Sequence, residues 1–114
     1  DRLHRIEVPV GVAYGTDPDR VVALLLDVAR SNDRLLEEPA PQALFKGFGE
    51  SSLDFVLRAW TDEEYEPRTS ELALAVHRSL CDAGIAIPFP QRDLHLASVS
   101  PEARAALSGV DRTA

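Results

Sequence analysis

Apolar and polar residues alternate near the start of the chain with the period of a β-strand. Every even position from Ile6 to Tyr14 carries an apolar side chain, whereas positions 5, 7, 9 and 11 carry arginine, glutamate, proline and glycine. Side chains that alternate in this way lie on opposite faces of a strand, one of them buried. The pattern predicts a half-buried strand over residues 6–14, which Gly15 ends.

The period then changes to that of a helix. Asp17 is a typical N-cap residue, and Pro18 suits the first helical position. The apolar residues that share one arc of a helical wheel are Val21, Val22, Leu25, Val28 and Ala29. Charged residues occupy the opposite arc, so a first amphipathic helix is predicted here, followed by a loop that Pro39 and Pro41 close.

Two further strands are expected in the middle of the chain. Residues 42–48 form a weak strand pattern, and residues 52–60 form a stronger one after a turn at 49–51. In the stronger strand Leu53, Phe55, Leu57 and Ala59 alternate with Asp54, Val56, Arg58 and Trp60. One face of this strand is therefore apolar, whereas the other is mixed.

A second helix is predicted from about Tyr65 to Ala83, with Pro67 in its first turn. The residues on its apolar arc are Leu72, Ala73, Val76, Leu80 and Ala83. Gly84 follows and can take the left-handed conformation that ends a helix. Pro88 and Pro90 next fix two backbone angles and remove two amide donors, so residues 88–91 are expected to form a rigid extended arm.

The chain is expected to end its folded part with a fourth strand, Arg92–Leu96. The order strand, helix, two strands, helix, strand predicts an α+β fold, a ferredoxin-like βαββαβ sandwich with a four-stranded antiparallel sheet and two helices on one face. We expect one domain over residues 1–97 and a flexible tail or linker over 98–114. The sheet face without helices should carry Val56 and Trp60 beside Arg58, and we interpret it as a partner surface.

Three segments resemble one known family. They are IEVPVGVAYGTDPDRVVALL at residues 6–25, DFVLRAW at 54–60 and DAGIAIPFPQRDLHL at 82–96. Together they are similar to the C-terminal cytoplasmic domain of the small-conductance mechanosensitive channel (MscS) family, over roughly residues 3–96. The Gly-Ile-x-Ile-Pro-Phe-Pro-Gln pattern before a final strand is the most specific part of the resemblance.

The resemblance implies a function. In that family seven subunits each contribute membrane helices and an α/β domain, and these domains form a perforated chamber below the pore on the cytoplasmic side of the cell membrane. It implies that this chain is part of the chamber wall and self-associates, as a homo-heptamer in the full-length channel. Pro88, Phe89, Pro90 and Gln91 match the family's connecting arm and are the expected subunit contacts. The family also has a short strand after the arm that closes a small barrel, for which residues 98–114 show no β-pattern.

Composition adds limits on partners. The chain has 114 residues, a formal net charge of -7 and one cysteine, and its pI is about 4.8. An acidic domain is repelled by phosphate backbones, so nucleic acid is not an expected partner. The longest apolar run, residues 21–26, is far shorter than a membrane span, so contact with the membrane would come only through a missing part of the chain. Because there is no methionine and the first residue is Asp1, we expect a fragment of a longer protein.

No residue pattern indicates catalysis, a cofactor or a metal. His4 and His95 would lie on neighbouring strands but should point to opposite faces, so a shared metal site is not favoured. Cys81 is interpreted as a structural thiol on the outer side of its helix, without a histidine base at obvious spacing. The acidic residues 62–66 are interpreted as a solvated helix start.

Two alternatives and one secondary role stay open. The chain could be a stand-alone ferredoxin-like regulatory module that binds a small ligand at a helix–sheet edge. It could be an acylphosphatase-like hydrolase, although that would need an arginine in an anion-binding loop and a partnering asparagine, and Asn32 is the only asparagine. If several copies surround a chamber, their acidic charge would enrich cations near the wall, which suggests ion filtering.

Overall fold

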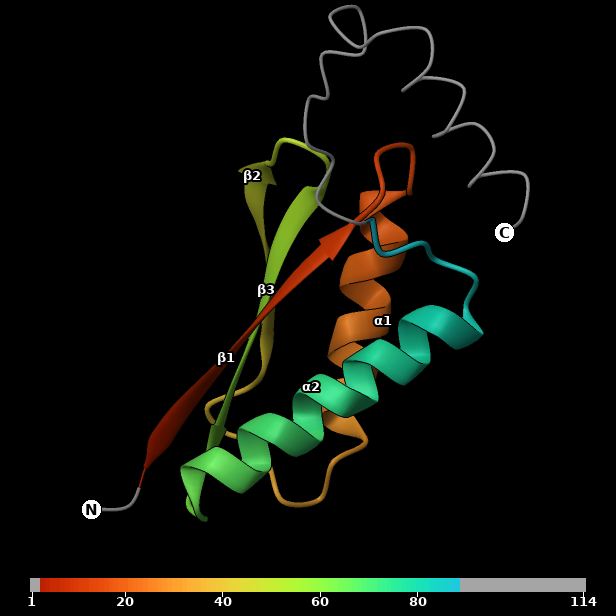
Figure 1. Cartoon of the computed structure of the whole chain (residues 1–114). Helices are drawn as coiled ribbons and strands as arrows, with labels where there is room; N and C mark the ends of the chain where they lie inside the picture. The colour runs from red at the N-terminus through yellow and green to blue at the C-terminus, as the bar shows by residue number, and fades with distance from the viewer. Residues whose placement is uncertain (1–2, 89–114) are drawn as a thin grey trace, which may run out of the picture.

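The structure is a computed structural model that describes residues 3–88. The elements follow the order β1 (His4–Val12), α1 (Pro18–Arg30), β2 (Gln42–Phe48), β3 (Leu53–Thr61) and α2 (Tyr65–Asp82). The strands form one antiparallel sheet in the order β1-β3-β2, so β3 is central (Figure 1). An α+β fold with two helices and an antiparallel sheet is confirmed.

The predicted fourth strand, Arg92–Leu96, lies outside the described residues. The four-stranded ferredoxin-like arrangement and the division at residue 97 therefore stay predictions. In the described part, the sheet has three strands, and β1 and β2 are its outer strands.

The limits of β1 differ from the sequence prediction. The strand begins at His4 and ends at Val12, because Thr61 and Leu53 of β3 pair with these two residues. Tyr14 lies beyond the ladder in a turn, and half of its surface is exposed. Its hydroxyl donates a hydrogen bond to the Gly49 carbonyl oxygen in the β2–β3 hairpin. The alternation correctly predicted the strand, but the pairing partner sets where it ends.

Helix α1 begins where its sequence signals place it. The side chain of Asp17 accepts a hydrogen bond from the backbone N–H of Asp19 at 3.0 Å, and Pro18 occupies the first helical position. This cap satisfies an N–H that has no partner within the helix. The predicted apolar arc is confirmed, since Val21, Leu25 and Val28 are buried.

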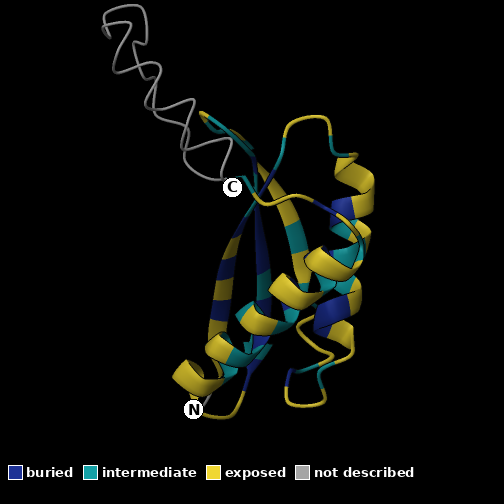
Figure 2. Cartoon of the chain, turned by 45° about the vertical axis from the view of Figure 1, so that its right-hand side comes forward, coloured by how far each residue is buried: buried dark blue, intermediate teal, exposed yellow. Residues whose placement is uncertain are grey.

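The core lies between the sheet and the helices. It gathers the inward residues of the strands and the apolar arcs of both helices, and both helices cover the same side of the sheet (Figure 2). The members with no more than 1% of their surface exposed are Ile6, Val12, Val21, Leu25, Ala29, Phe55, Leu57, Ala59, Leu72 and Leu80. Burial of this apolar surface is the main favourable term that holds the fold.

Helix α2 ends in a glycine cap that fixes the direction of the chain. Gly84 has φ +73°, the backbone N–H of Gly84 donates to the Cys81 carbonyl, and that of Ile85 donates to the Leu80 carbonyl. These two bonds define the Schellman motif, in which the glycine takes the left-handed conformation. Ile85 is buried beneath the helix end. The predicted helix stop is confirmed.

The chain after this cap runs along the end of β1. The backbone N–H of Ala13 donates to the carbonyl of Ala86 at 3.0 Å. The Arg20 guanidinium of α1 donates to the carbonyl of Ala83 at 2.6 Å, so it adds a donor at the C-terminus of α2. These contacts fix the position of residues 83–86 beside α1 and the end of β1.

Candidate functional site

Neither of the two described helices covers one face of the sheet, and we call this face the open face (Figure 2). It is formed by the alternate residues of the three strands that point away from the core. They include Arg5, Glu7, Pro9, Gln42, Leu44, Val56, Arg58 and Trp60. Val56, Arg58 and Trp60, the residues expected on this face from the sequence, all belong to it.

An apolar row crosses the middle of the open face. Pro9 of β1 and Leu44 of β2 both pair with Val56 of β3, so the three residues lie side by side. Val56 is only 8% exposed, although it is not part of the core cluster. Leu44 remains 38% exposed. The outer strands therefore carry the accessible apolar surface, more than the central valine.

A polar row crosses all three strands beside the apolar one. The Arg58 Nε atom donates to Glu7 Oε2 at 2.7 Å, and Arg58 Nη1 donates to Gln42 Oε1 at 3.2 Å. Arg5 also approaches the Glu7 carboxylate, at 3.9 Å. The charge of Arg58 is thus neutralised within the face, which leaves the row polar without a net positive charge.

The hydrogen bond from Arg58 lowers the pKa of Glu7 below its ordinary value of 4.5; desolvation opposes this, and the positive charges of Arg58, Arg5 and Lys46 add to it. A carboxyl whose pKa is lower in the folded state stabilises the fold above its unfolded-state pKa. That contribution is lost as the pH falls from about 4.5 through the lowered value.

We therefore expect Glu7→Gln to reduce the pH dependence of stability in acid. Urea unfolding from pH 7 to pH 3 should show a difference between the parent chain and the variant that is largest near neutrality and shrinks below about pH 4.5. The matched control is Glu50→Gln, a change in the hairpin. A constant difference across this range would contradict the role of the Glu7 carboxylate.

The arm falls mostly outside the described residues. Of the four residues expected to make subunit contacts, Pro88 is described and half-buried, and Phe89, Pro90 and Gln91 lie outside. The structure therefore shows where the arm starts, next to the end of β1, and its contacts stay a prediction.

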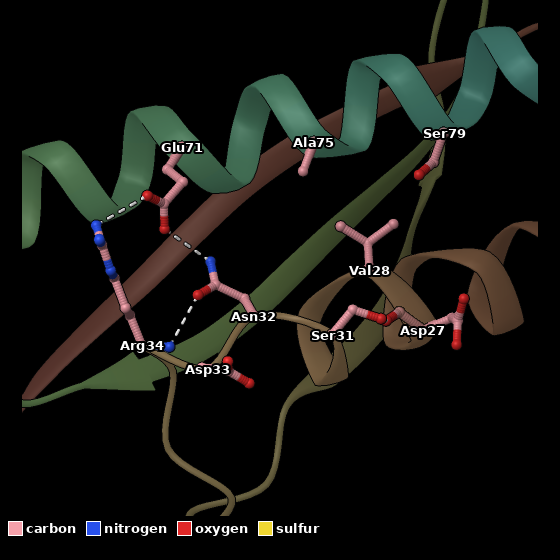
Figure 3. A pocket seen from close by; sticks show the side chains of 9 residues that line it. All are labelled: Asp27, Val28, Ser31, Asn32, Asp33, Arg34, Glu71, Ala75 and Ser79. Carbon is pink, nitrogen blue, oxygen red and sulfur yellow. Dashed lines mark hydrogen bonds and ion pairs between the residues drawn. The ribbon is translucent and has the colours of Figure 1, made fainter.

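A hollow of about 420 Å³ lies between the end of α1 and helix α2 (Figure 3). At one side of it the Asn32 amide and the Arg34 guanidinium both donate to the Glu71 carboxylate, at 3.0 and 3.3 Å. The Asn32 side-chain oxygen also accepts the Arg34 backbone N–H. Asn32, the one asparagine of the chain, is thus bound with Arg34 to a carboxylate of the domain itself. They join the loop after α1 to α2.

His4 and Cys81 are both exposed. His4 pairs with the buried Thr61, so it lies on the same face of β1 as Ile6 and Val8. Its ring is packed edge to face with Tyr65 at 6.4 Å between centroids. Cys81 is exposed as expected, but His77 Nε2 lies 3.7 Å from its sulfur. The expectation that no histidine lies at an obvious spacing from Cys81 was wrong, because residues four apart are neighbours on a helix. Among residues 3–88, no three potential metal ligands come together.

Sequence reasoning missed two exposed aromatic residues on β2. Phe45 and Phe48 are 44% and 77% exposed, and their ring centroids are 5.3 Å apart. The sequence signal that could have indicated them is the presence of two phenylalanines within a weak strand pattern, residues 42–48. The register irregularity between Phe45 and Gly47 places both residues opposite inward-facing partners on β3, Phe55 and Leu53.

A three-stranded antiparallel sheet with both described helices on one face defines an α+β domain. The family model described as "Mechanosensitive ion channel MscS, C-terminal" matches residues 6–87. The chain therefore belongs to the MscS family of mechanosensitive ion channels. The matched region runs from β1 to the last residue before the arm.

Individual relatives agree with this assignment. An uncharacterized MscS family protein of Synechocystis is 39% identical over 101 residues, which are 88% of this chain and 33% of that protein. The small-conductance mechanosensitive channel of Edwardsiella ictaluri is 38% identical over 81% of this chain and 32% of its own length. The chain is 29% identical to the closed-state crystal structure of Helicobacter pylori MscS, with a TM-score of 0.76 over 82% of this chain and 38% of that one.

The chain thus spans about a third of the length of these curated relatives. Neither helix in the described region is both long and apolar enough to cross a bilayer.

Proposed function

We propose that this chain is a wall-forming domain of a mechanosensitive channel. In the full-length protein, several copies, seven by resemblance to the family, would surround a chamber on the cytoplasmic side of the cell membrane. The observation that supports this most is the extent of the family match, which runs from Ile6 in β1 to Ile87, after the end of α2. Membrane-spanning segments would belong to other parts of the protein.

The open face is the proposed contact surface within this assembly. On one side its apolar row borders the polar row in which Arg58 pairs with Glu7, so another protein surface could cover these two rows without leaving the charge of Arg58 unpaired. The arm, residues 88–91, is the second proposed contact. Neither role requires a cofactor or a catalytic group.

Ion filtering is a proposed secondary role, and the distribution of charge supports it. The strands and the β2–β3 hairpin carry three basic residues, Arg5, Lys46 and Arg58, and three acidic ones, Glu7, Glu50 and Asp54. The acidic excess of the described residues therefore lies in the helices and the loops that adjoin them. Copies that turn this helical layer toward a chamber would concentrate cations there.

The test is electrical and uses the full-length protein. Expressed in cells without other mechanosensitive channels, it should give conductance steps when suction stretches an excised patch. Leu44→Glu on the open face should reduce the number of active channels, whereas Leu74→Glu, at an exposed site on α2, should not.

Glu64→Gln together with Glu66→Gln should shift the reversal potential of the channel in a salt gradient. An unchanged reversal potential would exclude ion filtering by these residues. The absence of any tension-activated conductance would contradict the main proposal.

A further inference from the structure

Two side chains that can bind a metal, Cys81 and His77, lie next to each other on α2, and we call them the Cys–His pair. Both are exposed, and the Cys81 Sγ atom lies 3.7 Å from His77 Nε2. Figure 2 shows exposed residues along the side of α2 that faces away from the sheet. A thiolate and an imidazole are both ligands that zinc and similar divalent cations prefer. The Cys–His pair is therefore accessible to a cation from solvent.

The separation of the two ligand atoms matches that of two ligands on one metal ion. Zinc bonds to sulfur at about 2.3 Å and to an imidazole nitrogen at about 2.0–2.1 Å, with tetrahedral angles between the bonds. The two ligand atoms of such a centre therefore lie about 3.6 Å apart. The 3.7 Å between Sγ and Nε2 needs almost no adjustment. The Cys–His pair thus has the geometry of a chelate.

The helix backbone fixes this geometry. Residues four apart lie one above the other on the same side of a helix, and both members belong to the last two turns of α2. Metal binding would therefore order only the two side chains, and the conformational entropy lost would be small.

The surrounding charges do not repel a divalent cation. The Cys81 thiolate formed on binding and the neighbouring carboxylate of Asp82 are both negative. Two arginines offset them, Arg78 on α2 and Arg20, which binds the Ala83 carbonyl. The last turn of α2 itself holds no basic residue, and the carbonyl groups at a helix C-terminus favour a positive charge.

We propose that the Cys–His pair binds one divalent cation of the zinc type in each chain. Binding breaks the Cys81 S–H bond, forms the bond from sulfur to the metal and releases the proton to solvent, while His77 Nε2 donates its lone pair. No three potential ligands come together within residues 3–88, so water would complete the coordination. This inference is separate from the proposed channel function and does not depend on it.

Titration of the purified, reduced chain with Co²⁺ tests the site. Cobalt replaces zinc in sites of this kind, and its bond to a thiolate gives a charge-transfer absorption in the near ultraviolet. Because Cys81 is the one cysteine of the chain, this absorption reports on a single residue. It should saturate at one cobalt per chain, and an excess of Zn²⁺ should remove it. Zinc should also raise the urea midpoint of the parent chain and not that of Cys81→Ser.

Variants separate the pair from the thiol alone. His77→Gln should weaken cobalt binding by more than about tenfold, since even the loss of an outer partner of a ligand has an effect of that size. The matched variant combines His77→Leu with Leu74→His, which keeps the composition but places the imidazole about 10 Å from Cys81 along the helix. It should weaken binding as much. His4→Gln, at an exposed histidine on β1, should leave binding unchanged.

Three results would overturn the proposal. Equal cobalt affinity in the parent chain and in His77→Gln would show that the thiolate binds without the histidine. Saturation at one cobalt per two chains would show that cysteines of two copies share the metal. No charge-transfer absorption in the reduced parent chain, with the circular dichroism of the folded state, would show that the pair does not bind the metal.

Discussion

Replacing Leu57 with alanine is expected to lower the free energy of unfolding by about 2–5 kcal/mol. Leu57 is fully buried in the central strand, where Val8 and Ala43 pair with it on either side. Both flanking strands fix the backbone, so the site cannot easily collapse around the lost atoms. Domains are commonly stable by only about 5–15 kcal/mol, so this loss is a large share of the total.

Urea unfolding followed by circular dichroism checks this expectation. The matched control is Leu74→Ala, which removes the same atoms from an exposed position on α2 and should cost no more than about 0.5 kcal/mol. Equal effects of the two substitutions would show that the core does not lie between the sheet and the helices.

The second large effect is expected at Gly84. A side chain at φ +73° is strained, and a β-carbon at this position would meet no atom within 4 Å, so the cost comes from the backbone and not from a clash. We expect Gly84→Val to cost about 1–3 kcal/mol, because a β-branched residue is poorly tolerated in the left-handed region. Gly84→Asn should cost clearly less, since asparagine visits that region more readily.

The comparison of these two variants tests the cap directly. Urea midpoints should rank the parent chain first, the asparagine variant second and the valine variant last. If valine and asparagine had the same effect, the left-handed conformation at Gly84 would not be what ends α2. The turn that leads from α2 into residues 85–88 therefore depends on this one residue.

The sequence predicted best what local chemistry decides. Asp17 and Pro18 give the start of α1 because a cap and a fixed φ act within one turn. Gly84 likewise marks the end of α2 through its own backbone freedom. The apolar arcs of both helices also agree with the buried residues, because the period of a helix is set by its own backbone and does not depend on the elements that pack against it.

The sequence predicted least where distant residues meet. The burial of Val56 depends on Pro9 and Leu44, which only the register of three strands brings beside it. The contact between the rings of Phe45 and Phe48 depends on the irregularity at Phe45–Gly47, which a simple alternation cannot show. The His77–Cys81 contact differs from these long-range contacts, because its spacing of four residues can be seen in the sequence.

We propose that this domain belongs to a channel that opens under membrane tension. The most direct measurement is a patch-clamp recording of the full-length protein in a membrane without other mechanosensitive channels, with suction increased in steps. Reproducible conductance steps are expected above a threshold tension. A membrane that contains the correctly inserted protein and stays silent up to its rupture tension would contradict it.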